Sequence, residues 1–388
     1  MLENQDIICI SSVDWEPLWT RKQQVMSRLP RSNRILYVEP PISILSPFKD
    51  PACWQKWRSW REGIRRISEN IFLLSPPVVL PFGNKHQEIN LINQIPIAHS
   101  VRKAASQLGM KNPILWTYLH NSADLVGRLG EKLVVYDCVD EHSAYQGFDP
   151  ETVKALERKL LAKADIVFVT AQGLYNDKAP LCEEIHLLPN AADISHFKKA
   201  NDDSIEVANE LKELPWPVLG FVGVIKEWID LDLIYQIALQ RPNWAIVMIG
   251  PIGAGINVDR LNTLPNLRFL GHRDRQVLPN YLKGFDVCLN PFKMDRLTET
   301  VSPLKFYEYL ASGKPIASVP MPEILGFSDV VEIGAGSEGF LQAIERALKD
   351  TPEKKAQRLL RAGENSWENR VEFMMEKISS HLILEAST

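Results

Sequence analysis

One stretch near the start of the last quarter, "VSPLKFYEYLASGKPIASVP" (301–320), carries residues suited to binding a charged and hydroxylated ligand. Ser302 is a predicted N-cap, and Pro303 suits the first helical position. The free N–H groups of that first turn, with the helix dipole and Lys305, would attract an anion. Glu308, one to two turns further on, could accept hydrogen bonds from two hydroxyls. The alternative is an ordinary capped helix with an exposed Lys–Glu pair and no ligand.

Glycines at predicted strand ends suggest a second part of the same site. Gly223, Gly250 and Gly271 each end an apolar run, where a glycine lets the backbone turn sharply and approach a ligand closely. Lys226 follows the first of them by three residues and could reach a phosphate as a point charge. Tight strand–helix turns and a solvated loop lysine are the plain alternatives.

Candidate acid–base residues occur in the first half, in "VVYDCVDEHSAY". Asp140, and after it His142, could take a proton from a hydroxyl if geometry allows. His120 is a weaker candidate of the same kind. Trp15 and Arg21, in the loop after the first strand, could line the same cleft. The alternatives are that Asp140 caps the next helix and that Trp15 is a core residue.

Short apolar runs alternate with helix-length segments in both halves, which predicts two parallel, doubly wound sheets. We therefore expect an α/β protein of two Rossmann-like domains that face a cleft, with ligands beyond the carboxyl ends of the strands. The predicted strands are 6–11, 34–39, 71–76, 113–119, 132–139, 165–171, 184–190, 217–223, 244–250, 267–271, 287–292, 315–320 and 330–334. The expected domains are 1–195, 196–365 and a final helical segment, 366–388.

Length and composition restrict the class of protein. The 388 residues favour two domains, and the net charge of −4 argues against a general nucleic-acid binder. Five scattered cysteines support neither a disulfide framework nor a zinc site. The start of the chain lacks the features of a signal peptide, and we expect no membrane-spanning helix. A cytoplasmic location is expected, with attachment to the inner face of the membrane left open.

The segment 51–71, "PACWQKWRSWREGIRRISENI", predicts an amphipathic helix with Trp54, Trp57 and Trp60 on one side. The basic residues lie mostly elsewhere, which suits the headgroup layer of an anionic membrane. The alternative is that the tryptophans pack on the N-terminal sheet.

These motifs together resemble the GT-B glycosyltransferases, in particular family 4 (glycosyl transferases group 1). The resemblance rests on "VSPLKFYEYLASGKPIAS", "GFVGVIKEWIDLDLI", "WAIVMIGP", "NLRFLGHRD" and "YLKGFDVCLNPF", and in the first half on "ADIVFVTAQGL" and "IHLLPNAADISHF". It implies that the last helix crosses back to the N-terminal domain. Thr300 and Val224 stand where family members often have an acidic residue and an arginine.

The resemblance implies a binding site for a nucleoside diphosphate sugar, with Glu308 on the ribose, and with first-turn amides and Lys226 on the diphosphate. Segment 271–273 would lie against the base. The implied nucleotide-sugar residues are Gly223, Lys226, Gly250, Gly271, His272, Arg273, Ser302, Pro303, Leu304, Lys305 and Glu308; the acceptor residues are Trp15, Arg21 and His120. No cofactor or metal is expected beyond the donor, a UDP- or GDP-sugar.

The implied function is a hexosyltransferase that acts on a hydroxyl acceptor, a lipid-linked or polysaccharide precursor in cell-surface glycan synthesis. Two alternatives stay open: a nucleotide-sugar-binding protein that has lost catalysis, and a GT-B-like sugar-nucleotide epimerase.

Overall fold

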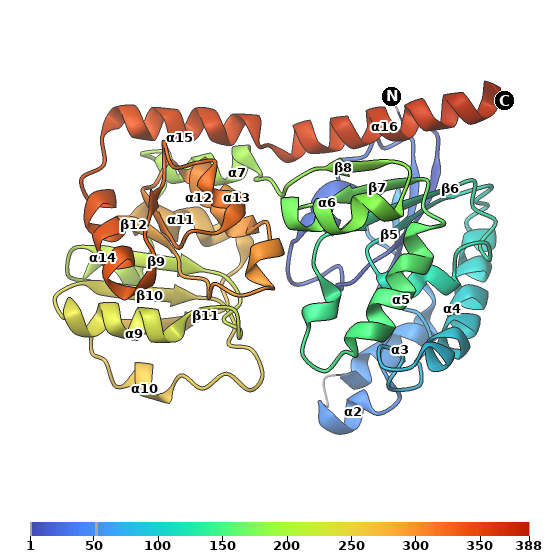
Figure 1. Ribbon diagram of the computed structural model, residues 1–388, viewed down its shortest axis with the longest axis horizontal. Coiled ribbons are helices and arrows are strands. Elements are labelled where there is room, and N and C mark those ends of the chain that lie inside the picture. The colour runs from blue at the N-terminus through green and yellow to red at the C-terminus, as the bar shows by residue number, and fades with distance from the viewer. Residues whose placement is uncertain (1, 51–52, 388) are drawn as a thin grey trace. The chain divides into compact units, whose positions relative to one another are not determined.

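The computed structural model describes residues 2–50 and 53–387 and divides into two compact units. Unit 1 comprises 1–189 and 370–388, and unit 2 comprises 190–369. The first division therefore lies at Pro189, a few residues before the position expected from the sequence. Each unit is built on one sheet with helices packed against it (Figure 1).

The sheet of unit 1 has the order β3-β4-β2-β1-β5-β6-β7-β8. All neighbours are parallel except β3, which pairs antiparallel with β4. Its strands are β1 (Asp6–Ile10), β2 (Arg34–Val38), β3 (Ile64–Arg66), β4 (Ile71–Leu74), β5 (Ile114–Thr117), β6 (Leu133–Cys138), β7 (Ile166–Val169) and β8 (Ile185–Leu187). Its helices are α1 (Arg21–Met26), α2 (Ser46–Lys49), α3 (Trp54–Glu62), α4 (Gln87–Gln107), α5 (Pro150–Leu161) and α6 (Gln172–Lys178), with 3-10 turns η2 (His120–Asp124), η3 (His142–Ala144) and η4 (Ala179–Leu181).

The strands of unit 1 are buried because helices cover both faces of the sheet. Ile97 and Val101 of α4 pack on Ile8 and Leu36 of the sheet. Around α5 and α6 a second cluster forms, in which Leu160 meets the strand residues of β6 and β7. A parallel sheet covered on both faces needs nearly continuous apolar strands, which is why these runs could be recognised in the sequence.

The sheet of unit 2 has the order β11-β10-β9-β12-β13-β14 and is parallel throughout. Its strands are β9 (Val218–Val222), β10 (Ala245–Ile249), β11 (Leu267–Gly271), β12 (Val287–Asn290), β13 (Ile316–Ser318) and β14 (Glu332–Ile333). Its helices are α7 (Ile194–Phe197), α8 (Asn209–Lys212), α9 (Leu231–Gln240), α10 (Asp259–Asn262), α11 (Leu278–Gly284), α12 (Leu304–Ser312), α13 (Pro322–Leu325), α14 (Gly336–Ala347) and α15 (Pro352–Glu364), with 3-10 turns η5 (Lys198–Asn201), η6 (Arg275–Val277) and η7 (Thr298–Thr300).

The strand orders locate the places where each sheet can bind a ligand. Chain order reverses between β1 and β5 in unit 1, and between β9 and β12 in unit 2. At such a reversal the connections leave in opposite directions and open a crevice beyond the carboxyl ends of the two strands. The predicted strands are all present. The segments after β1, β5, β9 and β12 lie where the strand order predicts a ligand site.

The last helix, α16 (Trp367–Ser387), begins in unit 2, and from Arg370 onward it belongs to unit 1. Phe373 packs edge-on against His186 of β8, with ring centroids 5.5 Å apart. Arg370 Nε donates to the Pro189 carbonyl at 3.0 Å. Among the described residues, every helix is too short or too polar to cross a membrane.

The predicted helix over 51–71 is wrong in its second half. Residues 51 and 52 lie outside the described residues, α3 ends at Glu62, and Gly63 turns the chain with φ = 76°. Ile64–Arg66 then form the edge strand β3. The alternative interpretation, a tryptophan face buried on the sheet, is also wrong, because no residue of α3 is buried.

Candidate functional site

The segment expected to hold an anion is helix α12, which starts just beyond the carboxyl end of β12. Pro303, not Ser302, is its N-cap, and within the described residues no side chain caps the helix. The Ser302 hydroxyl instead accepts the Asn190 N–H at 3.1 Å, and the Asn190 side-chain amide donates to the Ser302 carbonyl at 2.7 Å. The predicted cap was wrong because this distant asparagine engages the serine. The first-turn amides of Leu304 and Lys305 are thereby left without a side-chain acceptor.

Helix α12 is anchored at both ends. At its C-terminus Gly313 adopts the left-handed conformation with φ = 68°, as the sequence predicts for a helix that stops there. On its inner face the Tyr309 hydroxyl accepts the Val222 N–H, 2.7 Å away, at the last residue of β9. This bond holds the middle of α12 against the neighbouring strand of the sheet, and the Asn190–Ser302 contact holds the residues just before the helix.

Glu308 is buried, 4% exposed, and forms an ion pair with Lys305 at 2.7 Å. The pair was anticipated only as an exposed one. A buried carboxylate needs such a partner, because an isolated charge in a poorly hydrated place is costly. One carboxylate oxygen accepts the ammonium, and the carboxylate keeps further acceptor capacity for hydroxyl donors.

Two lysines flank the carboxyl ends of β9 and β12. Lys226 follows β9, is exposed, and has Nζ 5.0 Å from the centre of the Trp228 ring. Together with Lys293, which follows β12, it lines a cavity of about 450 Å³. The charged lining also includes Arg260 and the acidic Glu227, Asp232 and Asp259, and the described residues that line the cavity include none from α12. Lys293 was missed because a lone lysine in a polar loop carries no sequence signal.

The strand-end glycines have different roles. A Cβ on Gly250, whose φ is 143°, would lie 1.8 Å from the Gly223 carbonyl oxygen, so the Gly223–Gly250 contact is a close approach of two backbones. This contact fits the alternative given for these glycines, a tight strand–helix turn, and not a contact with a ligand. Gly271 has φ = 70°, with open space where a Cβ would stand. The next residue, His272, is exposed.

Arg273 is held inside unit 2 rather than free for a base. Its Nε donates to the Tyr281 hydroxyl at 2.7 Å, and its guanidinium pairs with Glu210 at 3.1 Å. Arg273 is thus already hydrogen-bonded to these partners, whereas the neighbouring His272 is exposed.

The acid–base candidates of unit 1 gather beyond the carboxyl ends of β5 and β6. The His120 and His142 rings lie 5.0 Å apart, and both are buried. Burial, together with the nearby charge of Lys22, lowers the pKa of His142 to about 4. His142 is therefore neutral at pH 7 and a weak base, whereas Asp140 is a half-buried carboxylate close enough to raise the pKa of Lys22.

Lys22 is the residue of this cluster that sequence reasoning missed. It is buried, its ammonium lies 5.4 Å from the centre of the Tyr118 ring, and desolvation lowers its pKa. A basic residue in a charged run such as "TRKQQ" is usually solvated, so nothing in the sequence marked it.

Two expected acceptor residues belong to the interior of unit 1. Arg21 is buried, with its Nε 3.0 Å from both Asp137 oxygens and Nη1 3.0 Å from the Leu188 carbonyl. Trp15 is also buried and packs edge-on against Tyr37, with ring centroids 5.0 Å apart. The expectation that Arg21 and Trp15 line the acceptor cleft is therefore wrong, because both side chains are buried and make these contacts within unit 1. In the part of the chain that the structure describes, no three His, Cys, Asp or Glu side chains are placed to hold a metal ion.

Comparisons with known proteins indicate a family and a fold. Residues 217–376 match the family described as glycosyl transferases group 1. Over 206 residues the chain is 30% identical to Bacillus subtilis TuaH, named as a glycosyltransferase of teichuronic acid biosynthesis; the match covers 49% of this chain and 51% of TuaH. The chain thus spans about half the length of that curated relative.

Solved structures establish the fold. Sucrose-phosphate synthase from Thermosynechococcus elongatus aligns over 99% of this chain and 100% of its own, with a TM-score of 0.69 and 16% identity. Anabaena HepE in complex with UDP aligns over 97% of this chain and 100% of its own, with a TM-score of 0.65 and 13% identity. Escherichia coli trehalose-6-phosphate synthase bound to UDP-2-fluoro glucose aligns over 96% and 98%, with a TM-score of 0.66 and 12% identity. The chain has the two-domain Rossmann-like fold known as GT-B.

Proposed function

We propose that this protein, whose residues 217–376 match the family of glycosyl transferases group 1, moves a sugar from a nucleoside diphosphate sugar to a hydroxyl acceptor. The observation that carries the proposal is the start of α12. There, amides without a side-chain cap, Lys305 and the buried Glu308 meet at the carboxyl edge of a parallel sheet. That edge is where open α/β sheets bind ligands.

In unit 2 the donor would bind through charge and hydrogen bonding. The first-turn amides, Lys305 and Lys226 receive the diphosphate, since a helix N-terminus and cations both favour anions. When Lys305 turns to the diphosphate, the Glu308 carboxylate becomes available to the two ribose hydroxyls. The base lies against the backbone of 271–273 and the His272 ring. Uridine is the base we propose, because HepE and the trehalose-6-phosphate synthase are named with UDP ligands.

In unit 1 the acceptor hydroxyl would meet Asp140. The bond between the anomeric carbon and the diphosphate oxygen breaks, a bond from that carbon to the acceptor oxygen forms, and the hydroxyl proton passes to Asp140. The diphosphate leaves with its charge neutralised by the lysines and the helix amides. Asp140 is preferred over His142 because the carboxylate is only half-buried, whereas the histidine is buried and less open to a substrate.

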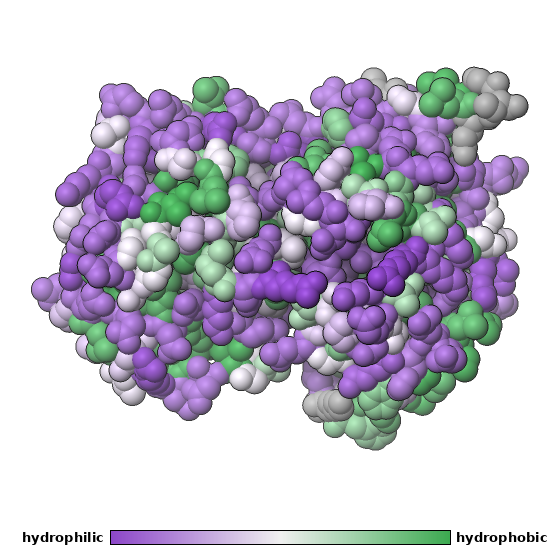
Figure 2. All heavy atoms as spheres, in the orientation of Figure 1, coloured by the Kyte–Doolittle hydropathy of each residue, from purple (hydrophilic) through white to green (hydrophobic). Residues whose placement is uncertain are grey.

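Unit 1 carries a surface suited to the headgroup layer of the inner face of a membrane. Figure 2 shows hydrophobic side chains gathered over α2. Phe48 is 78% exposed and Trp54 is 47% exposed, with exposed Arg58 and Arg61 on the same helix as Trp54. Aromatic and basic residues together bind anionic lipid surfaces. We propose a lipid-linked saccharide as acceptor, in cell-surface glycan synthesis, which the likeness to TuaH also supports.

A donor screen tests the enzyme assignment. The protein is incubated with UDP- and GDP-sugars, with and without an undecaprenyl-linked saccharide, and the products are separated by chromatography. Transfer, or slow hydrolysis with release of the nucleoside diphosphate, is the expected result. Binding without turnover would indicate a non-catalytic nucleotide-sugar binder, and conversion of the sugar nucleotide itself would indicate an epimerase. Either result would overturn the proposal.

A further inference from the structure

Lys22 is a buried lysine whose ammonium has no hydrogen-bonding partner in the part of the chain that the structure describes. The residue is 6% exposed. Its ammonium lies over the Tyr118 ring, 5.4 Å from the ring centre, and no described group accepts a hydrogen bond from it or forms an ion pair with it. Buried charges are normally paired, because an isolated one is costly. An unpaired ammonium in the interior therefore suggests a place for a ligand.

This lysine lies at the point where the strand order of unit 1 reverses. Lys22 is in the first turn of α1, which follows β1, and it stands over Tyr118, the residue directly after β5. β1 and β5 are the two neighbouring strands between which the chain order changes. The ammonium is therefore at the position where an open α/β sheet binds its ligand.

The charges around Lys22 leave Asp140 as its counterpart. The other nearby carboxylate, Asp137, is already bound by Arg21, whose Nε is 3.0 Å from both of its oxygens. Asp140 follows β6, the strand beside β5, and is half-buried. Burial lowers the pKa of Lys22, and the charge of Asp140 opposes that shift. Nevertheless the two groups form no ion pair, and no described residue donates a hydrogen bond to the Asp140 carboxylate.

A hydroxyl is the group that can satisfy both side chains at once. Its oxygen accepts a hydrogen bond from the ammonium, and its O–H donates to the carboxylate. A phosphate or carboxylate would serve Lys22 alone and would be repelled by the charge of Asp140. Water offers the same two bonds as a hydroxyl and would fill the place when no acceptor is bound.

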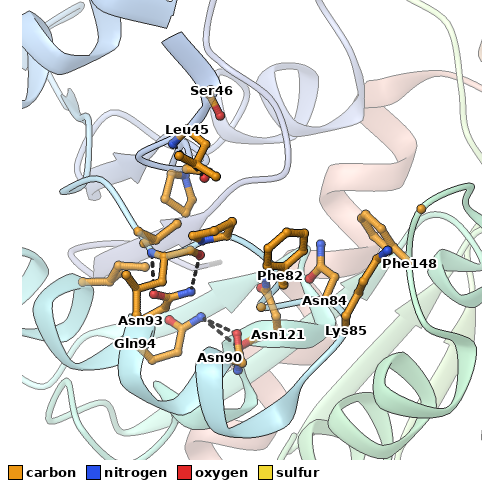
Figure 3. Close-up of a pocket in the computed structure, with 18 residues that line it drawn as sticks. Leu45, Ser46, Phe82, Asn84, Lys85, Asn90, Asn93, Gln94, Asn121 and Phe148 are labelled. Carbon is orange, nitrogen blue, oxygen red and sulfur yellow. Dashed lines mark hydrogen bonds between the residues drawn. The ribbon is translucent and has the colours of Figure 1, made fainter. Parts of the chain in front are cut away.

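The sugar that carries such a hydroxyl has room nearby, in a cavity of about 500 Å³ in unit 1 (Figure 3). Small-molecule sites typically measure about 300–1,000 Å³. Several carboxamides line it, among them Asn84 and Asn121, together with Phe148. The Phe148 ring is 6.2 Å from the His120 ring, which neighbours His142. The cavity thus borders the cluster to which Lys22 and Asp140 belong.

We propose that Lys22 holds the reacting hydroxyl of the acceptor: its ammonium donates a hydrogen bond to the hydroxyl oxygen, while Asp140 accepts the O–H. The inference rests on the proposed function, because it adds a second residue to the acceptor side of that reaction. As the proton passes to Asp140, the ammonium stabilises the negative charge that develops on the oxygen. The second lone pair of the oxygen stays available to attack the anomeric carbon.

The variant Lys22→Met measures this contribution, since methionine has a similar shape and lacks the ammonium. With a UDP-sugar and the undecaprenyl-linked saccharide, kcat/KM for the acceptor should fall at least about tenfold, because the lost hydrogen bond has a charged donor. The affinity for UDP, measured by calorimetry, should stay within about twofold, a change too small to matter beside that loss. Lys103→Met, at an exposed position on α4, should change neither quantity.

Melting temperature separates this role from a structural one. A buried ammonium without a partner destabilises the fold, so Lys22→Met should melt at the same temperature as the wild type or higher. A crystal structure of the unliganded wild type provides a check that needs no activity. It should show a water that bridges Lys22 Nζ and an Asp140 oxygen.

A lower melting temperature of Lys22→Met, or a direct ion pair between Lys22 and Asp140 in the crystal, would overturn the inference. Sugar transfer by the wild type with unchanged acceptor kinetics in Lys22→Met would refute the role of Lys22 alone. UDP binding by the wild type without transfer to any acceptor would refute the proposed function, and the role of Lys22 with it.

Discussion

Glu308 is a buried carboxylate. The Lys305 ammonium, 2.7 Å from one of its oxygens, stabilises the negative charge. Such a pair can exchange partners: the ammonium is drawn to a diphosphate, and the carboxylate to hydroxyl donors. Its spacing of three residues on a helix was readable from the sequence. Its burial was not, because burial depends on the Asn190–Ser302 contact and on Tyr309, which join distant segments.

If Asp140 is the base, replacing it should lower the turnover number and leave donor binding unchanged. Asp140→Asn should lower the turnover number about 10²- to 10⁴-fold, since a positioned base contributes about that much. The affinity for UDP, whose proposed site is in unit 2, should stay within about twofold. Steady-state kinetics and calorimetry on the same variant check both. A wild-type rate would exclude Asp140 as the base.

The buried His142 predicts a loss of stability in acid. Its pKa is about 4 in the folded protein and near 6.5 when unfolded, so the unfolded chain binds the proton more tightly. This contribution is complete above pH 6.5 and is lost as the pH falls towards 4, by about 3 kcal/mol for this residue alone.

His142→Gln should flatten that part of the curve of unfolding free energy against pH, measured by denaturant titration. The exposed His99 provides the matched control, and His99→Gln should leave the curve unchanged. Equal acid sensitivity in the His142 variant and the wild type would contradict the assignment.

At the scale of elements, the strands were predictable and their pairing was not. Runs such as "AIVMI" and "VVYDC" are buried on both faces of a parallel sheet, and this burial makes them visible in one sequence. The edge strand β3 was missed because three residues, "IRR", form a strand only by pairing with β4. Gly63, which ends α3, was the available signal for that boundary.

The chain segments that follow β9 and β10 approach each other closely, which predicts that Gly250 cannot be replaced without loss of stability. Gly250→Ala would put a methyl group 1.8 Å from a backbone oxygen at a φ of 143°. It should cost about 3 kcal/mol or more of the unfolding free energy, or prevent folding. Gly326→Ala, where a Cβ meets nothing within 4 Å, should cost far less. Similar melting temperatures for the two variants would refute the close contact.

The surface of α3 predicts salt-sensitive membrane binding. Reversing Arg58 and Arg61 to glutamate should reduce sedimentation with phosphatidylglycerol vesicles at least about tenfold at low salt, because each basic residue near an anionic surface contributes about 1 kcal/mol. Reversal of the exposed Arg102 and Lys103, on α4, makes the same change in net charge and is the control. Equal losses in both variants would remove any special role of α3.

At the scale of the whole molecule, the two units divide the proposed work between donor and acceptor. Two domains and their α/β class followed from the sequence because each half has its own series of apolar strands. The acceptor side was harder to predict. Arg21 and Trp15 have the side chains of ligand-binding residues, yet the structure uses them in the interior of unit 1. The cavity of unit 1 is built from carboxamides dispersed over several loops, a pattern that one sequence does not reveal.

The most direct measurement is calorimetric titration of UDP into the wild type, Glu308→Gln and the exposed control Glu338→Gln. We expect one site in the wild type and in the control, and an affinity at least about tenfold lower in Glu308→Gln, because hydrogen bonds to a charged group contribute about 1.5–3 kcal/mol. No heat of binding in the wild type with either UDP or GDP, or equal affinity in all three proteins, would contradict a nucleotide site at α12.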